Sequence, residues 1–321
     1  MKHYFITNPA AGKKNSCEIL SGDIENACRE KGVSFEIYKT TGVGDATDFV
    51  RRTCKSNTAG EELRFFACGG DGTLCEVVSG AVEYPFAAVG LIPKGTGNDF
   101  VRNFSNNESF FDFKSQLDAT EVSLDILKCN DMYAVNMVNI GFDCEVVKKM
   151  MKIKRSPLVP SKLAYIFGLL LTFIKKPGVN TSISINGGEE VEKSLLLTTV
   201  ANGCFCGGGF HSNPLALLTD GKINTLFVDN VKRLRFLSLV PSYKSGTHLV
   251  PKNDDILSSG TFDSIDFTFD GTQSISIDGE VREVEKKLHI EAIRGGLRFL
   301  VPLGSALISK VKKMTEGVLA Q

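Results

Sequence analysis

The sequence of 321 residues has no excess of charge of either sign, because 37 Lys and Arg residues balance 37 Asp and Glu residues. This balance argues against a protein that binds nucleic acid through bulk positive charge, although it allows a local basic patch that faces a membrane. A content of 42% hydrophobic and 23% charged residues is ordinary for a globular chain. The length is too great for one small core and suits two domains.

The nine cysteines lack the spacing of a zinc site or of a disulfide framework. No Cys-x-x-Cys pair occurs, and only Cys204 and Cys206 lie close together in the sequence. Most of the others fall inside apolar runs. We therefore expect reduced, buried thiols, as in a cytoplasmic protein.

Long apolar runs are lacking as well. None approaches the roughly 18 residues of a helix that spans a membrane. We expect the first residues, Met1 to Tyr4, to lead into a short strand and not to form a signal peptide. We expect a soluble protein that touches membranes only at their surface.

The most informative stretch runs from residue 63 to residue 81. An apolar run over 63–68 predicts a buried strand, and apolar residues at helical spacing over 74–81 predict a helix. Between them lie Gly69, Gly70, Asp71, Gly72 and Thr73. A glycine-rich loop that opens a helix lets a phosphate approach the main chain and meet the positive end of the helix dipole. An ordinary strand-to-helix turn is the simpler alternative, and a Walker-type loop is excluded because no G-x-x-x-x-G-K-[ST] occurs.

These five residues resemble the GGDGT signature shared by diacylglycerol kinases, sphingosine kinases, bacterial lipid kinases and NAD kinases. The continuation at 74–80 (LCEVVSG) is similar to the L-N-E-V-V-N-G stretch of the diacylglycerol kinase catalytic domain, although Cys75 stands where that family often has Asn. Residues 93–102 (PKGTGNDFVR) are similar to its P-x-G-T-x-N-D-F-A-R block. The chain is thus identified as a member of the diacylglycerol kinase catalytic-domain family, bacterial lipid kinase type, within the NAD kinase/diacylglycerol kinase superfamily.

The order of elements changes along the chain. Strands and helices alternate at first and predict an open, largely parallel α/β sheet. After about Asp125, many short strands with Gly, Asn and Asp turns predict a β-sandwich-like second domain. The resemblance implies the same NAD kinase/diacylglycerol kinase-like fold, in which a late strand at 297–302 returns to the first domain. We expect an ATP-binding α/β domain at 1–125 and 296–321, and a β-rich lipid-substrate domain at 126–295.

Ligands of such a sheet bind beyond the carboxyl ends of the strands, where the loops at 69–73 and 93–99 converge. The segment 8–13 resembles the N-P-x-x-G-K segment of the family. The resemblance implies that ATP is contacted by Asn8, Lys13, Thr40, Gly69, Gly70, Asp71, Gly72, Thr73, Thr96 and Asn98. Taken alone, Lys13 is also compatible with a solvated basic loop, and Thr40 with a helix cap.

Three aspartates are the candidates for holding Mg²⁺, which binds through a few carboxylates together with substrate phosphates. By resemblance, Asp71, Asp99 and Asp125 match a network of water and magnesium. Asp99 is also explained as the N-terminal charge of a short helix, and Asp125 needs a partner if it is buried. The turn at Asp220 resembles a structural cation site of some bacterial members, and the turn itself explains this residue equally well.

The segment Ser276–Glu280 (SIDGE) resembles the D-G-E near the end of the family domain, where the glutamate is the proposed general base. In this interpretation Glu280 accepts the proton of a lipid hydroxyl while Asp278 positions or polarises that hydroxyl. A plain Asp-Gly hairpin turn followed by solvated charges is the alternative.

The segment 161–174 is mostly apolar or aromatic and has basic residues on both sides. It is too short to span a bilayer. Two interpretations of this segment are compatible with its sequence. It forms either a helix that lies on an anionic membrane or lines a lipid pocket, or a helix buried against the β-rich domain.

Residues and resemblance together predict an ATP-dependent lipid kinase that transfers the γ-phosphoryl group to the hydroxyl of diacylglycerol or a related lipid. We expect it to be cytoplasmic and peripherally associated with the inner face of the membrane, with no nucleic-acid partner. Members of this family often dimerise, so a homodimer is an alternative to a monomer. The alternatives are an NAD kinase, which shares the glycine loop, and a non-catalytic nucleotide-binding lipid sensor.

Overall fold

The computed structural model describes residues 1–11, 16–142, 144–146, 148 and 178–308. The chain divides into two compact units, the first formed by Met1–Ile126 and the segment from Arg294, the second by Leu127–Ile293. Strands β6 (Thr120–Cys129) and β16 (Lys287–Val301) each belong in part to both. Lys13 and the segment 161–174 lie outside the described residues.

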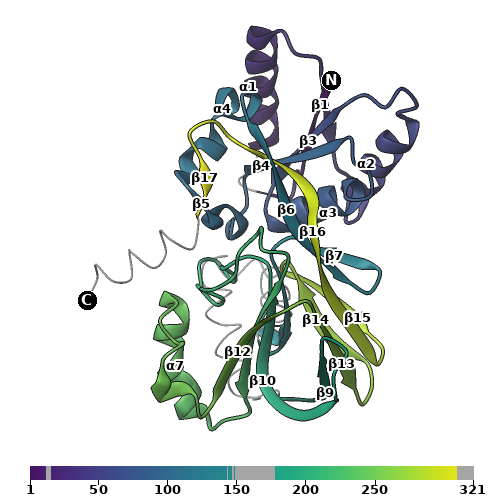
Figure 1. Ribbon diagram of the computed structural model, residues 1–321. Helices are drawn as coiled ribbons and strands as arrows, with labels where there is room; N and C mark the ends of the chain where they lie inside the picture. Colours follow the sequence, from purple (N-terminus) through teal and green to yellow (C-terminus); the bar gives the residue numbers. More distant parts are fainter. Residues whose placement is uncertain (12–15, 143, 147, 149–177, 309–321) are drawn as a thin grey trace. The chain divides into compact units, whose positions relative to one another are not determined.

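The first unit alternates strands and helices (Figure 1). Besides parts of β6 and β16, its elements are β1 (Lys2–Thr7), α1 (Ser16–Lys31), β2 (Phe35–Lys39), α2 (Asp45–Ser56), β3 (Leu63–Gly69), α3 (Asp71–Ala81), β4 (Ala87–Pro93), the 3₁₀ helices η1 (Phe100–Asn103) and η2 (Asn107–Phe111), β5 (Phe104–Ser105), α4 (Phe113–Leu117) and β17 (Ala306–Leu307).

The sheet of this unit has the strand order β16-β4-β3-β1-β2, and every neighbouring pair in it is parallel. Its strands are nearly continuous apolar runs, as is typical of parallel strands buried on both faces. The prediction of an open, parallel α/β sheet is confirmed.

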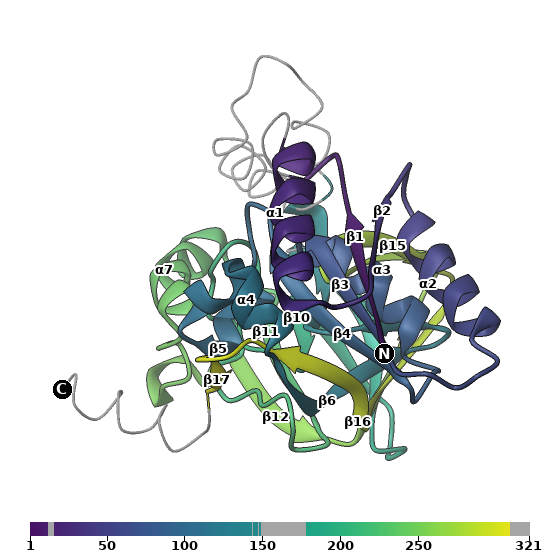
Figure 2. The ribbon, with the colours of Figure 1, turned by 90° about the horizontal axis from the view of Figure 1, so that it is seen from above.

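Helices cover both faces of the sheet because successive side chains of a strand point to opposite sides. On one face, Phe5 and Phe66 pack against Leu20 and Ile24 of α1. On the other face, Tyr4 meets Phe49 of α2, with ring centroids 5.9 Å apart. Figure 2 shows β1 and β2 between α1 and α2.

Arg298 fixes the return of β16 into the first unit. Its guanidinium donates from Nε to Glu121 Oε1 at 2.5 Å and from Nη2 to Glu121 Oε2 at 2.7 Å, and Nη1 reaches the carbonyl oxygen of Pro85 at 2.6 Å. A bidentate pair of this kind imposes geometry as well as charge. It holds β16 to β6 and to the loop before β4.

The second unit is mainly antiparallel β-structure. Its elements are β7 (Met132–Ala134), β8 (Met137–Gly141), β9 (Val179–Ile185), β10 (Val191–Ala201), β11 (Ile223–Asp229), α7 (Arg233–Ser245), the 3₁₀ helix η3 (Pro251–Asn253), β12 (Leu257–Phe262), β13 (Ser264–Phe269), β14 (Gln273–Ile277) and β15 (Glu280–Val284). The strand order is β15-β14-β8-β10-β9-β13-β16, and β11 and β12 extend from β10. The prediction of a second, β-rich domain is confirmed. Among the residues that the structure describes, none of the helices combines the length and the hydrophobicity of a membrane span.

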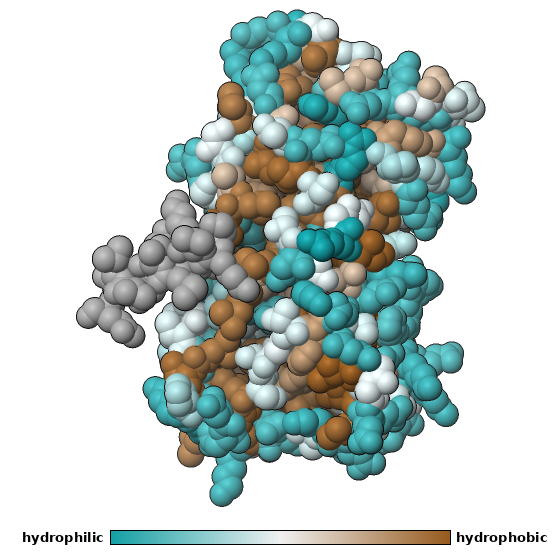
Figure 3. Space-filling model, viewed as in Figure 1, coloured by the Kyte–Doolittle hydropathy of each residue, from teal (hydrophilic) through white to brown (hydrophobic). Residues whose placement is uncertain are grey.

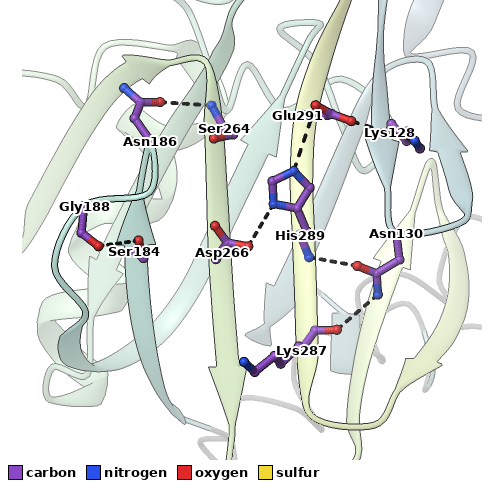
Figure 4. A network of polar contacts seen from close by, with 10 residues as sticks. All are labelled: Lys128, Asn130, Ser184, Asn186, Gly188, Ser264, Asp266, Lys287, His289 and Glu291. Carbon is purple, nitrogen blue, oxygen red and sulfur yellow. Dashed lines mark hydrogen bonds and ion pairs between the residues drawn. The ribbon is translucent and has the colours of Figure 1, made fainter.

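A polar network covers part of this sheet (Figure 4). The His289 ring lies between two carboxylates, with Nδ1 2.8 Å from Asp266 Oδ1 and Nε2 4.0 Å from Glu291 Oε2. Lys128 Nζ lies 3.9 Å from Glu291 Oε1. Asn130 bridges to β16 by accepting from the His289 amide and donating to the Lys287 carbonyl. This face is therefore polar and partly exposed, and Lys128 and His289 lie beside carboxylates.

Candidate active site

Four loops of the first unit leave the sheet at one edge. Thr7, Gly69 and Pro93 are the last residues of β1, β3 and β4, and the register pairs Thr7 with Cys68 and Gly69 with Pro93. Parallel strands in register bring the loops that follow them to the same place. The loops that begin at residues 8, 40, 70 and 94 therefore form one candidate site.

The glycine loop ends β3 and begins α3 without an intervening turn. Gly70 is the N-cap of α3, and no side chain caps the helix there. A Cβ on Gly69 would lie 2.2 Å from Thr73 Oγ1, so only glycine fits at this position. Asn8 Nδ2 donates to Thr73 Oγ1 at 3.1 Å and ties the first loop to the second. The helix start is thus held to the first loop and carries no side-chain cap, an arrangement that suits a phosphate at the helix N-terminus.

The loop at 93–99 packs directly on the glycine loop. The Lys94 amide donates to the Gly69 carbonyl at 2.8 Å. A Cβ on Gly95 would lie 2.6 Å from the Cα of Gly70. The two motifs therefore touch through glycine backbones, with no room for a side chain between them.

Replacing Gly95 by alanine is expected to separate the two loops. We expect Gly95→Ala to lower the free energy of unfolding by about 1–3 kcal/mol, as overpacking does elsewhere. Gly22→Ala is the matched control, because Gly22 lies in α1 with nothing within 4 Å of an added Cβ. The control should gain about 0.5–1 kcal/mol from its better helix propensity. Urea titration of the two variants compares them, and an unchanged Gly95→Ala would show that the loops do not meet as described.

Asn98 turns this loop back toward the site. Its φ is 48°, and its Nδ2 donates to the Gly95 carbonyl at 3.0 Å. Its Oδ1 is buried and has no hydrogen-bond partner among the described residues. A buried acceptor without a partner is costly unless a ligand or water satisfies it, so this oxygen fits a bound group. Thr96, also expected to contact ATP, is exposed.

Two of the three predicted metal ligands come together around Gly97. An ideal Cβ on Gly97 would lie 3.2 Å from Asp71 Oδ2 and 3.4 Å from Asp99 Oδ2. Asp71 Oδ1 accepts from the Phe100 amide at 3.2 Å. Arg102 Nε lies 3.4 Å from Asp99 Oδ1. The sequence motif contained Arg102, but its contact with the carboxylate pair was not foreseen.

Asp125 is the third candidate and lies in β6. It is 1% exposed, and its Oδ1 accepts from the Gly295 amide at 2.8 Å. No group of three or more His, Cys, Asp or Glu side chains placed to hold a metal occurs within the described residues. Mg²⁺ is usually held by one or two carboxylates together with substrate phosphates and water. The pair Asp71 and Asp99 fits that requirement, and Asp125 as a third ligand stays a prediction.

Thr40 lies at the end of β2 and is buried. Its amide and its Oγ1 both donate to the Thr7 carbonyl, at 2.9 and 3.3 Å. The next residue, Thr41, donates its amide to Asp45 Oδ2 at 2.7 Å, and Tyr38 donates its hydroxyl to Asp45 Oδ1 at 2.9 Å. These two bonds lower the pKa of Asp45, with the Thr41 amide as the larger cause. The loop is therefore fixed by its own polar groups, and a direct contact of Thr40 with ATP stays a prediction.

Glu76 has a role that the sequence did not suggest. Its carboxylate accepts from the amides of Gly44 at 2.9 Å and Ala46 at 3.2 Å, and Thr47 Oγ1 donates to its carbonyl at 2.9 Å. Glu76 belongs to α3, and its carboxylate thus binds the N-terminal end of α2. It supplies the negative charge that a helix N-terminus favours. The contact joins residues 30 positions apart, and only the fold reveals it.

Asp278 and Glu280 belong to the second unit. Asp278 and Gly279 have φ values of 47° and 86° and form a two-residue hairpin turn between β14 and β15. The Asp278 carboxylate accepts from the amides of Val135, Asn136 and Met137, at 2.7, 3.0 and 2.8 Å. These bonds make Asp278 an anchor for the chain entering β8.

Glu280 begins β15 directly after this anchored turn and is half-buried. Its Oε2 accepts from Arg282 Nη2 at 2.6 Å. Asp220 accepts from the Lys222 amide at 3.1 Å, as a turn residue does. The roles of Glu280 as base and Asp220 as metal ligand stay predictions.

Comparison with known proteins covers both units. The model of the diacylglycerol kinase catalytic domain matches residues 2–129, and that of the YegS C-terminal NAD kinase beta sandwich-like domain matches 136–292. A Staphylococcus epidermidis protein named "Putative lipid kinase" is 27% identical over 263 residues, which are 80% of this chain and 82% of the relative. A Staphylococcus aureus protein of the same description is 25% identical over 287 residues, 87% and 90% of the two chains.

Solved structures share the fold. The crystal structure of a diacylglycerol kinase from Bacillus anthracis covers 94% of this chain and 97% of its own, with a TM-score of 0.67 and 19% identity. A second structure from that organism has the same coverage, a TM-score of 0.71 and 22% identity.

Proposed function

Because this chain belongs to the diacylglycerol kinase catalytic-domain family, we propose that it is an ATP-dependent kinase whose acceptor is a lipid hydroxyl. Diacylglycerol or a related lipid is the proposed acceptor. The observation that carries the proposal is the contact of the loops at 69–73 and 93–99, which sets Asp71 and Asp99 around one point beside a helix start.

The residues of the first unit would bind the nucleotide. The amides at the start of α3 would receive the phosphates, and the Asn98 oxygen would accept from a nucleotide hydroxyl or an ordered water. Asp71 and Asp99 would hold Mg²⁺ together with the phosphates, and the ion would supply positive charge for the phosphoryl group in transfer.

Glu280 would take the proton of the attacking hydroxyl. A general base takes up a proton on its carboxylate, and the Asp278 carboxylate, which already accepts from three backbone amides, is less suited to that task. Asp278 would instead fix the turn that presents Glu280. This division of roles refines the expectation that both carboxylates act on the hydroxyl.

The test is transfer of label from γ-labelled ATP with Mg²⁺ and purified protein. The acceptors are diacylglycerol, a sphingoid base, phosphatidylglycerol and a polyprenol in mixed micelles, and NAD in solution. Label in one lipid is the expected result. Label in NAD alone would make the chain an NAD kinase, and the absence of label from every acceptor, with ATP still bound, would favour a non-catalytic sensor.

A further inference from the structure

Helix α7 of the second unit has two apolar faces, and only one of them packs against the core. Phe236, Leu239 and Tyr243 follow one another at helical spacing and are buried. They pack into a cluster with residues of β10, β11 and β12. The inner face of the helix is thereby packed against the core of the second unit.

The outer face carries apolar residues that this packing does not use. Leu234 is 81% exposed and Leu237 is 42% exposed. With Pro241, also exposed, they occupy positions i, i+3 and i+7, which lie on one side of a helix. Isolated exposed leucines are common, but a stripe along one helix face is a feature of surfaces that meet an apolar partner.

Basic residues predominate around this stripe. Residues 231–253 contain five Lys and Arg residues and no Asp or Glu. Lys232 lies at the start of the helix, Lys244 lies in its last turn, and both are exposed, as is Lys252 in η3. Asp254 and Asp255 follow, and Asp255 pairs with Arg235 at 2.9 Å. Figure 3 shows brown and teal residues side by side at the lower left, where α7 lies in Figure 1.

We propose that the outer face of α7 docks the protein on the surface of an anionic lipid bilayer. Leucines in the boundary region with cations at the level of the headgroups are the arrangement of interfacial helices. Each basic residue held at an anionic surface raises the association constant about fivefold. The polar face of β13 and β16, where cations stand beside carboxylates, lacks this combination.

The inference does not depend on the proposed kinase activity, because docking uses neither the glycine loop nor Glu280. The proposed membrane contact lies on α7 and does not involve the segment 161–174. Transfer to a lipid in detergent micelles and binding to vesicles are separate measurements, so either proposal can fail alone.

The experiment is flotation of the full chain with phosphatidylcholine vesicles, with and without phosphatidylglycerol, in the absence of nucleotide. We expect binding only to the anionic vesicles. Leu234→Ser with Leu237→Ser should lower the association constant about tenfold, from the apolar area withdrawn. Lys232→Glu with Lys244→Glu should lower it by at least as much, and added salt should weaken the binding of the wild type.

Two control variants are matched to these changes. Leu215→Ser removes another leucine of the same unit that is 52% exposed, and Lys287→Glu reverses an exposed lysine beside the polar network. Both should bind vesicles like the wild type. Unfolding midpoints of all variants show whether each is folded.

Three outcomes would overturn the proposal. Folded leucine variants that bind like the wild type would place the membrane contact elsewhere. Equal binding to neutral vesicles would remove the role of charge. A change of sedimentation coefficient in the leucine variants without lipid, with vesicle binding unaltered, would make the face a contact between copies of the chain.

Discussion

Glu280→Gln is expected to lower the rate of phosphoryl transfer by about 10²–10⁴-fold, the usual contribution of a general base. Glutamine keeps the size of the side chain and can still accept from Arg282, but it cannot take a proton. The Michaelis constant for ATP should stay unchanged, because the nucleotide is assigned to the first unit. Initial rates at saturating ATP, with the lipid found to be the acceptor, measure the effect.

Glu283→Gln is the matched control for this change. Glu283 lies in the same strand, β15, and its side chain is exposed. We expect it to leave the rate unaltered. The ion pair of Glu280 with Arg282 lies near the surface and contributes at most about 1 kcal/mol, so both variants should unfold like the wild type. A Glu280→Gln protein with full activity would remove Glu280 as the base and leave the kinase assignment in place.

Asp71→Asn is expected to lower the rate by about 10²–10³-fold, since the chain would lose one of the two carboxylates proposed to hold Mg²⁺ beside the transferred phosphoryl group. The asparagine oxygen can still accept from the Phe100 amide, so the contact between the two loops should persist. The concentration of Mg²⁺ needed for half-maximal rate should rise. A magnesium titration of the initial rate measures both effects.

Asp112→Asn provides the comparison for Asp71→Asn. Asp112 is the N-cap of α4 and accepts from the Ser115 amide at 2.8 Å, so it too is an aspartate at a helix start of the first unit. It should retain full activity and an unchanged magnesium dependence. If the two variants lose activity equally, the effect of Asp71 is one of folding and not of metal or phosphate binding.

The elements with strong local patterns could be predicted from the sequence. The run at 63–68 and the helical spacing at 74–81 correspond to β3 and α3, because a buried parallel strand and an amphipathic helix each have their own period. The convergence of the loops at 69–73 and 93–99 followed from the rule for parallel strands. The strand predicted at 297–302, however, corresponds to the last part of a longer strand, β16, of 15 residues.

Contacts between distant segments could not be predicted. The amides that hold Asp278 lie more than 140 positions earlier in the chain, and those bound to Glu76 lie at the start of another helix. Helix α7 was not expected either, because Pro241 interrupts its pattern and some of its apolar residues face outward. In each case tertiary packing determines a role that local spacing does not encode.

The most direct test of the central claim is the fate of the γ-phosphate when wild-type protein, Mg²⁺ and labelled ATP are incubated with the lipid panel and with NAD. Label should appear in a lipid phosphomonoester with wild type and with Glu283→Gln, and should be nearly lost with Glu280→Gln and with Asp71→Asn. Label that appears in NAD, or only as inorganic phosphate in every reaction, would contradict the assignment of a lipid kinase.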